Sequence, residues 1–363
     1  MLGNKSGVAK RLLDFCPYLI VNHCVAHKLA LACKDASKEI EFYEKAEELM
    51  SRIYNFFKKS STRTQELKNY QELLDCPQYK IKKIYKIRWL SWYEAIKNVC
   101  DTLPALIEML SNDYSEVSVN LYEDLCNWRM IGFFYFLYDI LSHLTKLSKF
   151  FQRENLRFCD IRPMIEGTIN SIEKEYVNIN DAQHFFGVNF QNLMIITNPF
   201  NSPPNIGSHS LKFTNEDYDD LIVDIYRYSS SVVEEIKNRF PNVELIDSFK
   251  ILNPREWNLT NDNISSYGRK ELSVLLEHFG KEKESNDKYF NPLIKKNECQ
   301  DEWMIYKTII KSNFDKMKIE AILPILIKEY SDVFPNIVKL IKIAYTVPFS
   351  SVPCERGFSK QNL

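Results

Sequence analysis

Apolar residues recur every three or four positions along one long stretch of this chain, between Leu121 and Asn155. The recurring positions are Phe133, Phe136, Leu137, Ile140, Leu141, Leu144, Leu147 and Phe151. This spacing is the repeat of an α-helix, whereas a half-buried strand would alternate with a period of two. Aromatic residues also occupy neighbouring positions, so the helix would be apolar on most sides. The pattern therefore predicts a helix at the centre of a bundle.

Glycine is scarce throughout the chain, with 9 glycines against 23 Phe and 20 Tyr in 363 residues. A turn-rich β-sandwich needs more glycine, so the composition favours long helices joined by short connections. Further helices are predicted over residues 161–176, 221–240, 302–314 and 316–328. Acidic residues from Glu216 onward favour a helix start there. Two polar segments are predicted connections: residues 198–215, which are also a predicted sub-domain boundary, and residues 280–291.

The first forty residues carry the one convincing α/β pattern. Residues 8–15 are predicted to form a helix that Pro17 ends. Leu19 to Cys24 is a short apolar and β-branched run, which predicts a buried strand. The Ala- and Leu-rich residues 26–38 predict a second helix.

The charge and the cysteines bear on the binding partners and the cellular compartment of the chain. The net charge is −1, so binding to nucleic acid would need a local basic patch. The nine cysteines include no Cys-x-x-Cys pair, which favours a reducing compartment, the cytosol or the nucleus. The longest apolar run, residues 130–141, is too short to span a bilayer and contains Asp139. The chain is therefore expected to be soluble and intracellular, with no membrane partner.

A local basic patch does occur, over residues 52–97. It holds 11 Lys or Arg against 4 acidic residues, a local net charge of +7, with tyrosines, phenylalanines and tryptophans interleaved. Lysines neutralise phosphates and aromatic faces stack on unpaired bases, so the patch suits DNA with exposed bases. The alternative is a solvated basic face that packs its aromatic rings inward. The predicted DNA contacts are Lys82, Lys83, Arg88 and Trp89.

Cys24 and His27 stand three residues apart, at the end of the predicted strand. They could be half of a zinc site, but a structural zinc needs four ligands and no second pair follows. The favoured interpretation is a local hydrogen bond that fixes the turn into the next helix. No metal site is predicted. Near the C-terminus, prolines and serines precede Glu355 and predict a helix start, where a carboxylate is favourable.

Three blocks of sequence, taken together, resemble the hAT transposase superfamily, and they occur in that family's order. The first runs from Met1 to Leu31 and includes the Cys24-x-x-His27 pair. The second is Arg88-Trp89-Leu90-Ser91, and the third runs from Ser350 to Ser359. The resemblance implies a mainly α chain with an incomplete RNase H-like α/β core, of one or few strands, interrupted by a large all-helical insertion. It divides the chain into a partial core (residues 1–41), the insertion (42–345), and a returning core helix that starts the dimerisation region (346–363).

The resemblance also bears on catalysis. Such transposases hold two divalent metal ions, Mg²⁺ or Mn²⁺, on two aspartates and one glutamate. Glu355 matches the glutamate, and Trp89 matches an aromatic that stacks on a flipped base. The aspartates have no match here, and in relatives the second precedes the position of Met1. Because one carboxylate cannot hold two metal ions, Glu355 is expected to be vestigial. The chain is expected to bind no cofactor and to have no transposase activity.

Three functions follow as alternatives. The first is a transposase-derived nuclear protein that binds DNA or dimerises, with itself or with a related hAT-type protein. The second is a fragment of an active transposase, which would cleave and join DNA only at full length. The third is a helical scaffold with no role in nucleic-acid binding.

Overall fold

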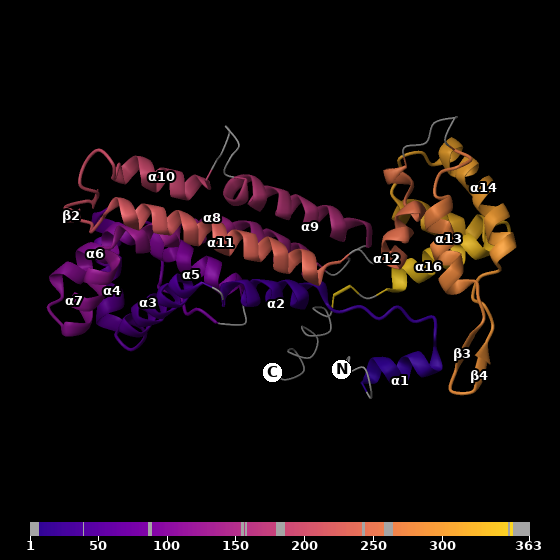
Figure 1. Ribbon diagram of the computed structural model, residues 1–363, viewed down its shortest axis with the longest axis horizontal. Coiled ribbons are helices and arrows are strands. Elements are labelled where there is room, and N and C mark those ends of the chain that lie inside the picture. Colours follow the sequence, from indigo (N-terminus) through magenta and orange to yellow (C-terminus); the bar gives the residue numbers. More distant parts are fainter. Residues whose placement is uncertain are drawn as a thin grey trace. The chain divides into compact units, whose positions relative to one another are not determined.

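The structure is a computed structural model (Figure 1), and it describes residues 7–38, 40–85, 89–153, 156, 158–178, 186–241, 244–257, 264–347 and 349–350. Within these residues the chain forms sixteen α-helices and two small antiparallel sheets of two strands each. The predicted mainly α class is thereby confirmed. None of the helices in the described ranges is long and apolar enough to cross a membrane.

Contacts divide the chain into two compact units. Unit 1 comprises Met1–Val25, Arg153–Pro163 and Pro241–Leu363, and unit 2 comprises Ala26–Gln152 and Met164–Phe240. The chain thus passes from one unit to the other within two helices, α2 (Val25–Ser37) and α9 (Phe158–Ile172), and again after residues 152 and 240. The domain boundaries implied by the hAT resemblance stay predictions.

Unit 2 is built of helices with one short hairpin. Besides parts of α2 and α9, its elements are α3 (Glu41–Lys58), α4 (Ser61–Leu73), α5 (Trp89–Asp101), α6 (Leu103–Asn112), α7 (Glu116–Leu125), α8 (Trp128–Phe151), the π-helix η1 (Glu173–Val177), α10 (Val188–Thr197), β1 (Asn205–Ile206), β2 (His209–Ser210) and α11 (Asn215–Arg239). The hairpin β1–β2 lies inside the segment that the sequence predicted as a connection.

Helix α8 is the centre of unit 2, as its periodicity predicted. It packs against α5, α10 and α11, and most of its apolar residues are fully buried. Gly132 allows α11 to come close, because a Cβ at this position would lie 2.5 Å from Leu221 Cδ2. Helix α11 starts at Asn215, so Glu216 and Asp217 lie in its first turn, as the sequence predicted. Its capping box pairs the Thr214 side chain with the Asp217 backbone N–H, and the Asp217 carboxylate with the Thr214 N–H.

Unit 1 also has a core of its own. Its elements are α1 (Val8–Phe15), α12 (Glu244–Ser248), the 3₁₀ turns η2 (Phe249–Leu252) and η3 (Pro254–Glu256), α13 (Arg269–Phe279), β3 (Lys283–Ser285), β4 (Lys288–Phe290), α14 (Lys296–Asn313), α15 (Ile319–Glu329) and α16 (Pro335–Thr346). Trp257, Trp303 and Tyr306 stack edge and face at the centre of this core, with ring centroids 5.7–6.0 Å apart.

The predicted strand from Leu19 to Cys24 was wrong. These residues form no strand, and Val21 is exposed. A strand needs a neighbour to pair its backbone groups, and both sheets in the described part of the chain are local hairpins that leave this segment out. A side chain anchors the segment instead: the Tyr18 hydroxyl donates to the Lys281 carbonyl at 2.7 Å. The RNase H-like core therefore stays a prediction.

Candidate nucleic-acid interface

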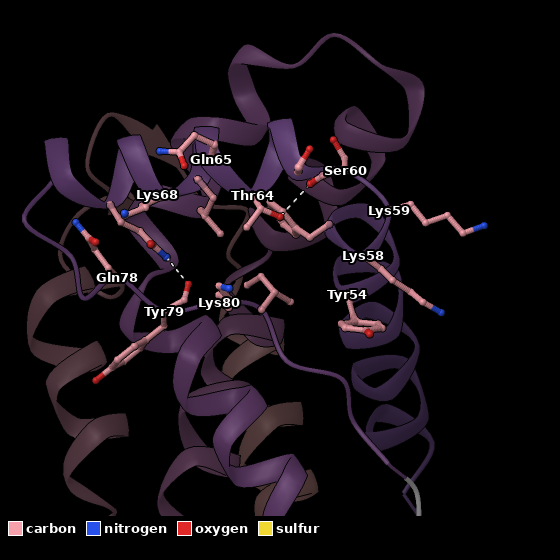
Figure 2. A pocket seen from close by; sticks show the side chains of 15 residues that line it. Tyr54, Lys58, Lys59, Ser60, Thr64, Gln65, Lys68, Gln78, Tyr79 and Lys80 are labelled. Carbon is pink, nitrogen blue, oxygen red and sulfur yellow. Dashed lines mark hydrogen bonds between the residues drawn. The ribbon is translucent and has the colours of Figure 1, made fainter.

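A cleft opens in unit 2 where α3, α4 and the coil before α5 meet (Figure 2). Its volume is about 960 Å³, within the range of sites that hold ligands. The coil follows α4 and contributes the edge formed by residues 78–81. The described residues that line it are Tyr54, Phe57, Lys58, Lys59, Ser60, Ser61, Thr64, Gln65, Leu67, Lys68, Gln71, Gln78, Tyr79, Lys80 and Ile81. We call this site the lysine cleft.

The lining of the lysine cleft is basic. It includes four lysines and no Asp or Glu among the described residues. Within the described part of the chain, none of these lysines has a carboxylate at ion-pairing distance; the four are Lys58, Lys59, Lys68 and Lys80. The cleft therefore gathers a charge of +4 that no described carboxylate neutralises.

Several other cations of the basic patch do have carboxylate partners. Arg52 pairs with Asp124 at 2.5 Å, and Arg63 lies 3.5 Å from Asp113. Lys97 also has a carboxylate partner, one turn further along α5. Such surface pairs stabilise the fold only slightly, but they do remove those cations from the charge that a ligand would meet.

The junction of α3 and α4 positions one wall of the cleft. Lys58 ends α3, and Ser60 caps α4 by accepting a hydrogen bond from the Arg63 N–H at 3.2 Å. The Thr64 hydroxyl donates to the Ser60 carbonyl at 3.0 Å. Lys58 and Lys59 therefore stand beside the start of α4, where the helix dipole adds partial positive charge.

Two buried amides hold the opposite wall. Gln71 Nε2 donates to the Tyr79 carbonyl at 2.9 Å, a bond drawn in Figure 2. Asn98 Nδ2 donates to the Lys80 carbonyl at 2.8 Å. Because both amides are buried, the backbone on either side of Lys80 is fixed to α4 and α5. The coil is thus an ordered part of the cleft.

Three described aromatic rings of the patch, Phe56, Phe57 and Trp92, are buried, and of these three Phe57 alone lines the lysine cleft. The Tyr79 ring has Lys97 Nζ 5.0 Å from its centroid, and Figure 2 shows it pointing away from Lys59 and Ser60. For these rings the alternative prediction, inward packing, is the one that the structure bears out. Tyr54 lines the cleft and is half-buried, so charge dominates the site.

Lys82 and Lys83, the two predicted DNA contacts whose side chains the structure describes, do not line the cleft. Lys82 pairs with Glu94 at 3.1 Å, and Lys83 Nζ lies 5.0 Å from the centroid of the Tyr85 ring. Arg88 lies outside the described residues, and Trp89 begins α5 with a side chain that is not described. The four lysines that line the cleft belong to the basic patch of residues 52–97, but they are not the two lysines that the sequence predicted as DNA contacts. The missed signal was the absence of acidic neighbours around Lys58 and Lys59.

Cys24 and His27, the predicted structural motif, both lie at the start of α2. Cys24 is half-buried directly before α2, and His27 is exposed in the first turn of that helix. In the ranges that the structure describes, no three His, Cys, Asp or Glu side chains gather so as to hold a metal ion. Glu355 lies outside the described residues.

Comparison with known proteins adds no assignment. No protein-family model matches the chain, and no solved structure matches it.

Proposed function

We propose that this chain binds nucleic acid through the phosphate backbone at the lysine cleft. The observation that carries the proposal is the set of four cleft lysines that no described carboxylate neutralises. A bound phosphate backbone would replace the missing carboxylates and release condensed counterions, which is the main source of such affinity. Since the whole chain has a net charge of −1, the attraction is local and orients the ligand toward the cleft.

The hAT resemblance supports placing this binding in a transposase-derived protein. On this proposal the chain keeps a partial RNase H-like core split by the helical insertion, and it acts in the nucleus. It binds DNA and a protein partner, either a second copy or a related hAT-type protein. Residues 1–363 by themselves would not cleave DNA, because only one of the three metal-binding carboxylates of such transposases has a match in them, at Glu355.

Salt-dependent binding tests the proposal. A fluorescent single-stranded oligonucleotide of ~20 nucleotides is titrated with the full chain at ~50 and ~200 mM salt. We expect the affinity to fall steeply with salt. The variant Lys58→Gln/Lys59→Gln should bind roughly tenfold more weakly at the lower salt, with a salt slope shallower by ~0.7 for each lost phosphate contact.

The matched control removes the same charge elsewhere in unit 2. Lys146 and Lys149 are exposed on α8 and lie outside the cleft lining. Lys146→Gln/Lys149→Gln should retain the affinity of the unmodified chain within about twofold. Equal losses in the two double variants, or binding that does not depend on salt, would show that the lysine cleft is not the site.

A further inference from the structure

Ser61 lines the lysine cleft at the start of α4. It is the first residue of α4, it is exposed, and it lines the cleft together with Lys58 and Lys59. Its hydroxyl makes no hydrogen bond within the described part of the chain. The neighbouring Ser60 hydroxyl is occupied, because it caps the helix through the Arg63 N–H. Of the two cleft serines, Ser61 is thus the one whose hydroxyl is available for modification.

The residues before Ser61 form a recognisable charge pattern. Lys58 and Lys59 stand three and two positions before it. Protein kinases select serines by such patterns of neighbouring charge. The backbone of Ser60 is already extended, with φ −127° and ψ 106°, and helix ends open more easily than helix centres. A kinase can therefore engage this segment without unfolding the body of α4.

We propose that Ser61 is phosphorylated by a protein kinase that recognises basic residues, and that the phosphate switches off nucleic-acid binding at the lysine cleft. This inference rests on the proposed function of the cleft. In the reaction, Ser61 Oγ attacks the γ-phosphorus of ATP. The bond from that phosphorus to the oxygen bridging to the β-phosphate breaks, ADP leaves, and the hydroxyl proton passes to the kinase's catalytic base.

The physical effect of the phosphate follows from its charge. A phosphoserine carries roughly −1.5 to −2 near neutral pH, so it would cut the +4 of the cleft lysines to about +2. The phosphate is tethered beside Lys58 and Lys59, so it competes with a nucleic-acid phosphate for the same cations. A phosphate in the first turn of a helix is also favourable for the helix dipole. The modification should therefore change charge while leaving α4 folded.

The test begins with the full chain, ATP and a kinase of basic-residue specificity. Peptide mapping by mass spectrometry should place the phosphate on Ser61. The phosphorylated chain should bind a fluorescent single-stranded oligonucleotide of ~20 nucleotides about tenfold more weakly at ~0.1 M salt. Ser61→Glu carries one charge, so it should weaken binding by about threefold.

Two variants separate the switch from a general charge effect. Thr62 is exposed beside Ser61 but does not line the cleft, so Thr62→Glu should change affinity by less than about twofold. Ser61→Gln, incubated with the same kinase and ATP, should keep the affinity that it has before the incubation. An unmodified Ser61, equal effects of the two glutamates, or full affinity in the phosphorylated chain would each overturn the inference. If Lys58→Gln/Lys59→Gln binds normally, the proposed function itself fails; if only the phosphate has no effect, the switch alone fails.

Discussion

At the scale of single residues, His278 shows how the start of the chain is fixed within unit 1. Its Nε2 lies 3.3 Å from the Tyr18 carbonyl, and Lys283 Nζ donates to the Pro17 carbonyl at 3.0 Å. Burial lowers the pKa of His278, and the positive charge of Lys283 lowers it further, although the Tyr18 carbonyl acts in the opposite direction. His278 is therefore held neutral in the folded chain at a pH where the unfolded chain begins to take up a proton.

This arrangement predicts that unit 1 is destabilised by acid. Because the pKa of His278 lies below its ordinary value of 6.5 in the folded state, the unfolded state binds more protons as pH falls below 6.5. The contribution of neutral His278 to the free energy of unfolding is therefore complete above pH 6.5, and it is lost as the pH falls through the lowered pKa. Urea unfolding followed by fluorescence of the buried Trp257 and Trp303 should show the loss.

His278→Gln, which does not titrate, should reduce this part of the pH dependence. The control is His27→Gln, at an exposed position on α2, which should unfold with the pH dependence of the unmodified chain. A His278→Gln chain that loses as much stability in acid as the unmodified chain would contradict the assignment.

At the scale of elements, α16 depends on another helix for its start. Phe334 cannot cap it, and the carboxylate of Glu302 on α14 takes that role. The carboxylate is buried, and its Oε2 accepts from the backbone N–H groups of Asn336 and Ile337, each at 2.9 Å. Four unpaired N–H groups begin every helix, so a buried helix start needs such an acceptor.

Glu302→Gln should destabilise unit 1 by about 1–3 kcal/mol, because one acceptor oxygen becomes an NH2 group, whereas Oε2 accepts from the backbone and Oε1 accepts from Asn336 Nδ2 at 2.5 Å. Chemical denaturation with fluorescence detection measures the change. Glu298→Gln on the same helix is the control. Its carboxylate is exposed and pairs with Lys295 at 2.9 Å, so its loss should cost less than about 0.5 kcal/mol. Equal costs would show that the capping contact is not what Glu302 contributes.

The two hairpins show why some elements escaped prediction. The turn between β3 and β4 uses Asn286 and Asp287, both with positive φ, at 50° and 59°. Two residues of positive φ make the turn type that suits hairpins, but the strongest sequence signal for it is Asn-Gly or Asp-Gly. The turn here is Asn286-Asp287 and contains no glycine, and polar residues flank it on both sides. The sequence of residues 280–291 therefore predicted a connection in place of a hairpin. The opposite error occurred at Leu19 to Cys24, where a strand was predicted and none forms. A β-branched run forms a strand only where a partner strand is available.

At the scale of the whole molecule, the chain builds two cores from interleaved segments. The buried cluster that contains Trp257, Trp303 and Leu276 draws only on segments of unit 1. Helix α8, with Leu137 fully buried, belongs to unit 2. A sequence pattern read in order cannot show this division, because unit 1 collects its parts from the beginning, the middle and the end of the chain.

Because the two units have separate cores, a cavity made by substitution in one core should destabilise that unit and leave the other little changed. Leu137→Ala should cost about 2–5 kcal/mol, as does loss of other fully buried leucine side chains. Hydrogen exchange should then lose protection in peptides from residues 89–151 and 215–239, with peptides from residues 269–346 little changed. Leu276→Ala should give the reverse pattern. Loss of protection in both units from either variant would show that the cores unfold as one.

The sequence by itself determined the mainly helical class, the central helix α8 and the start of α11. These follow from helical spacing and from the choice of residues at a helix end, which act over three or four positions. Only the tertiary structure decided which cations stay unpaired and which aromatic rings are buried. Arg52 and Asp124 are far apart in sequence, so their pairing depends on how α3 and α7 pack. The packing of α3, α4 and the coil before α5 likewise leaves Lys58, Lys59, Lys68 and Lys80 around one cleft without described carboxylate partners.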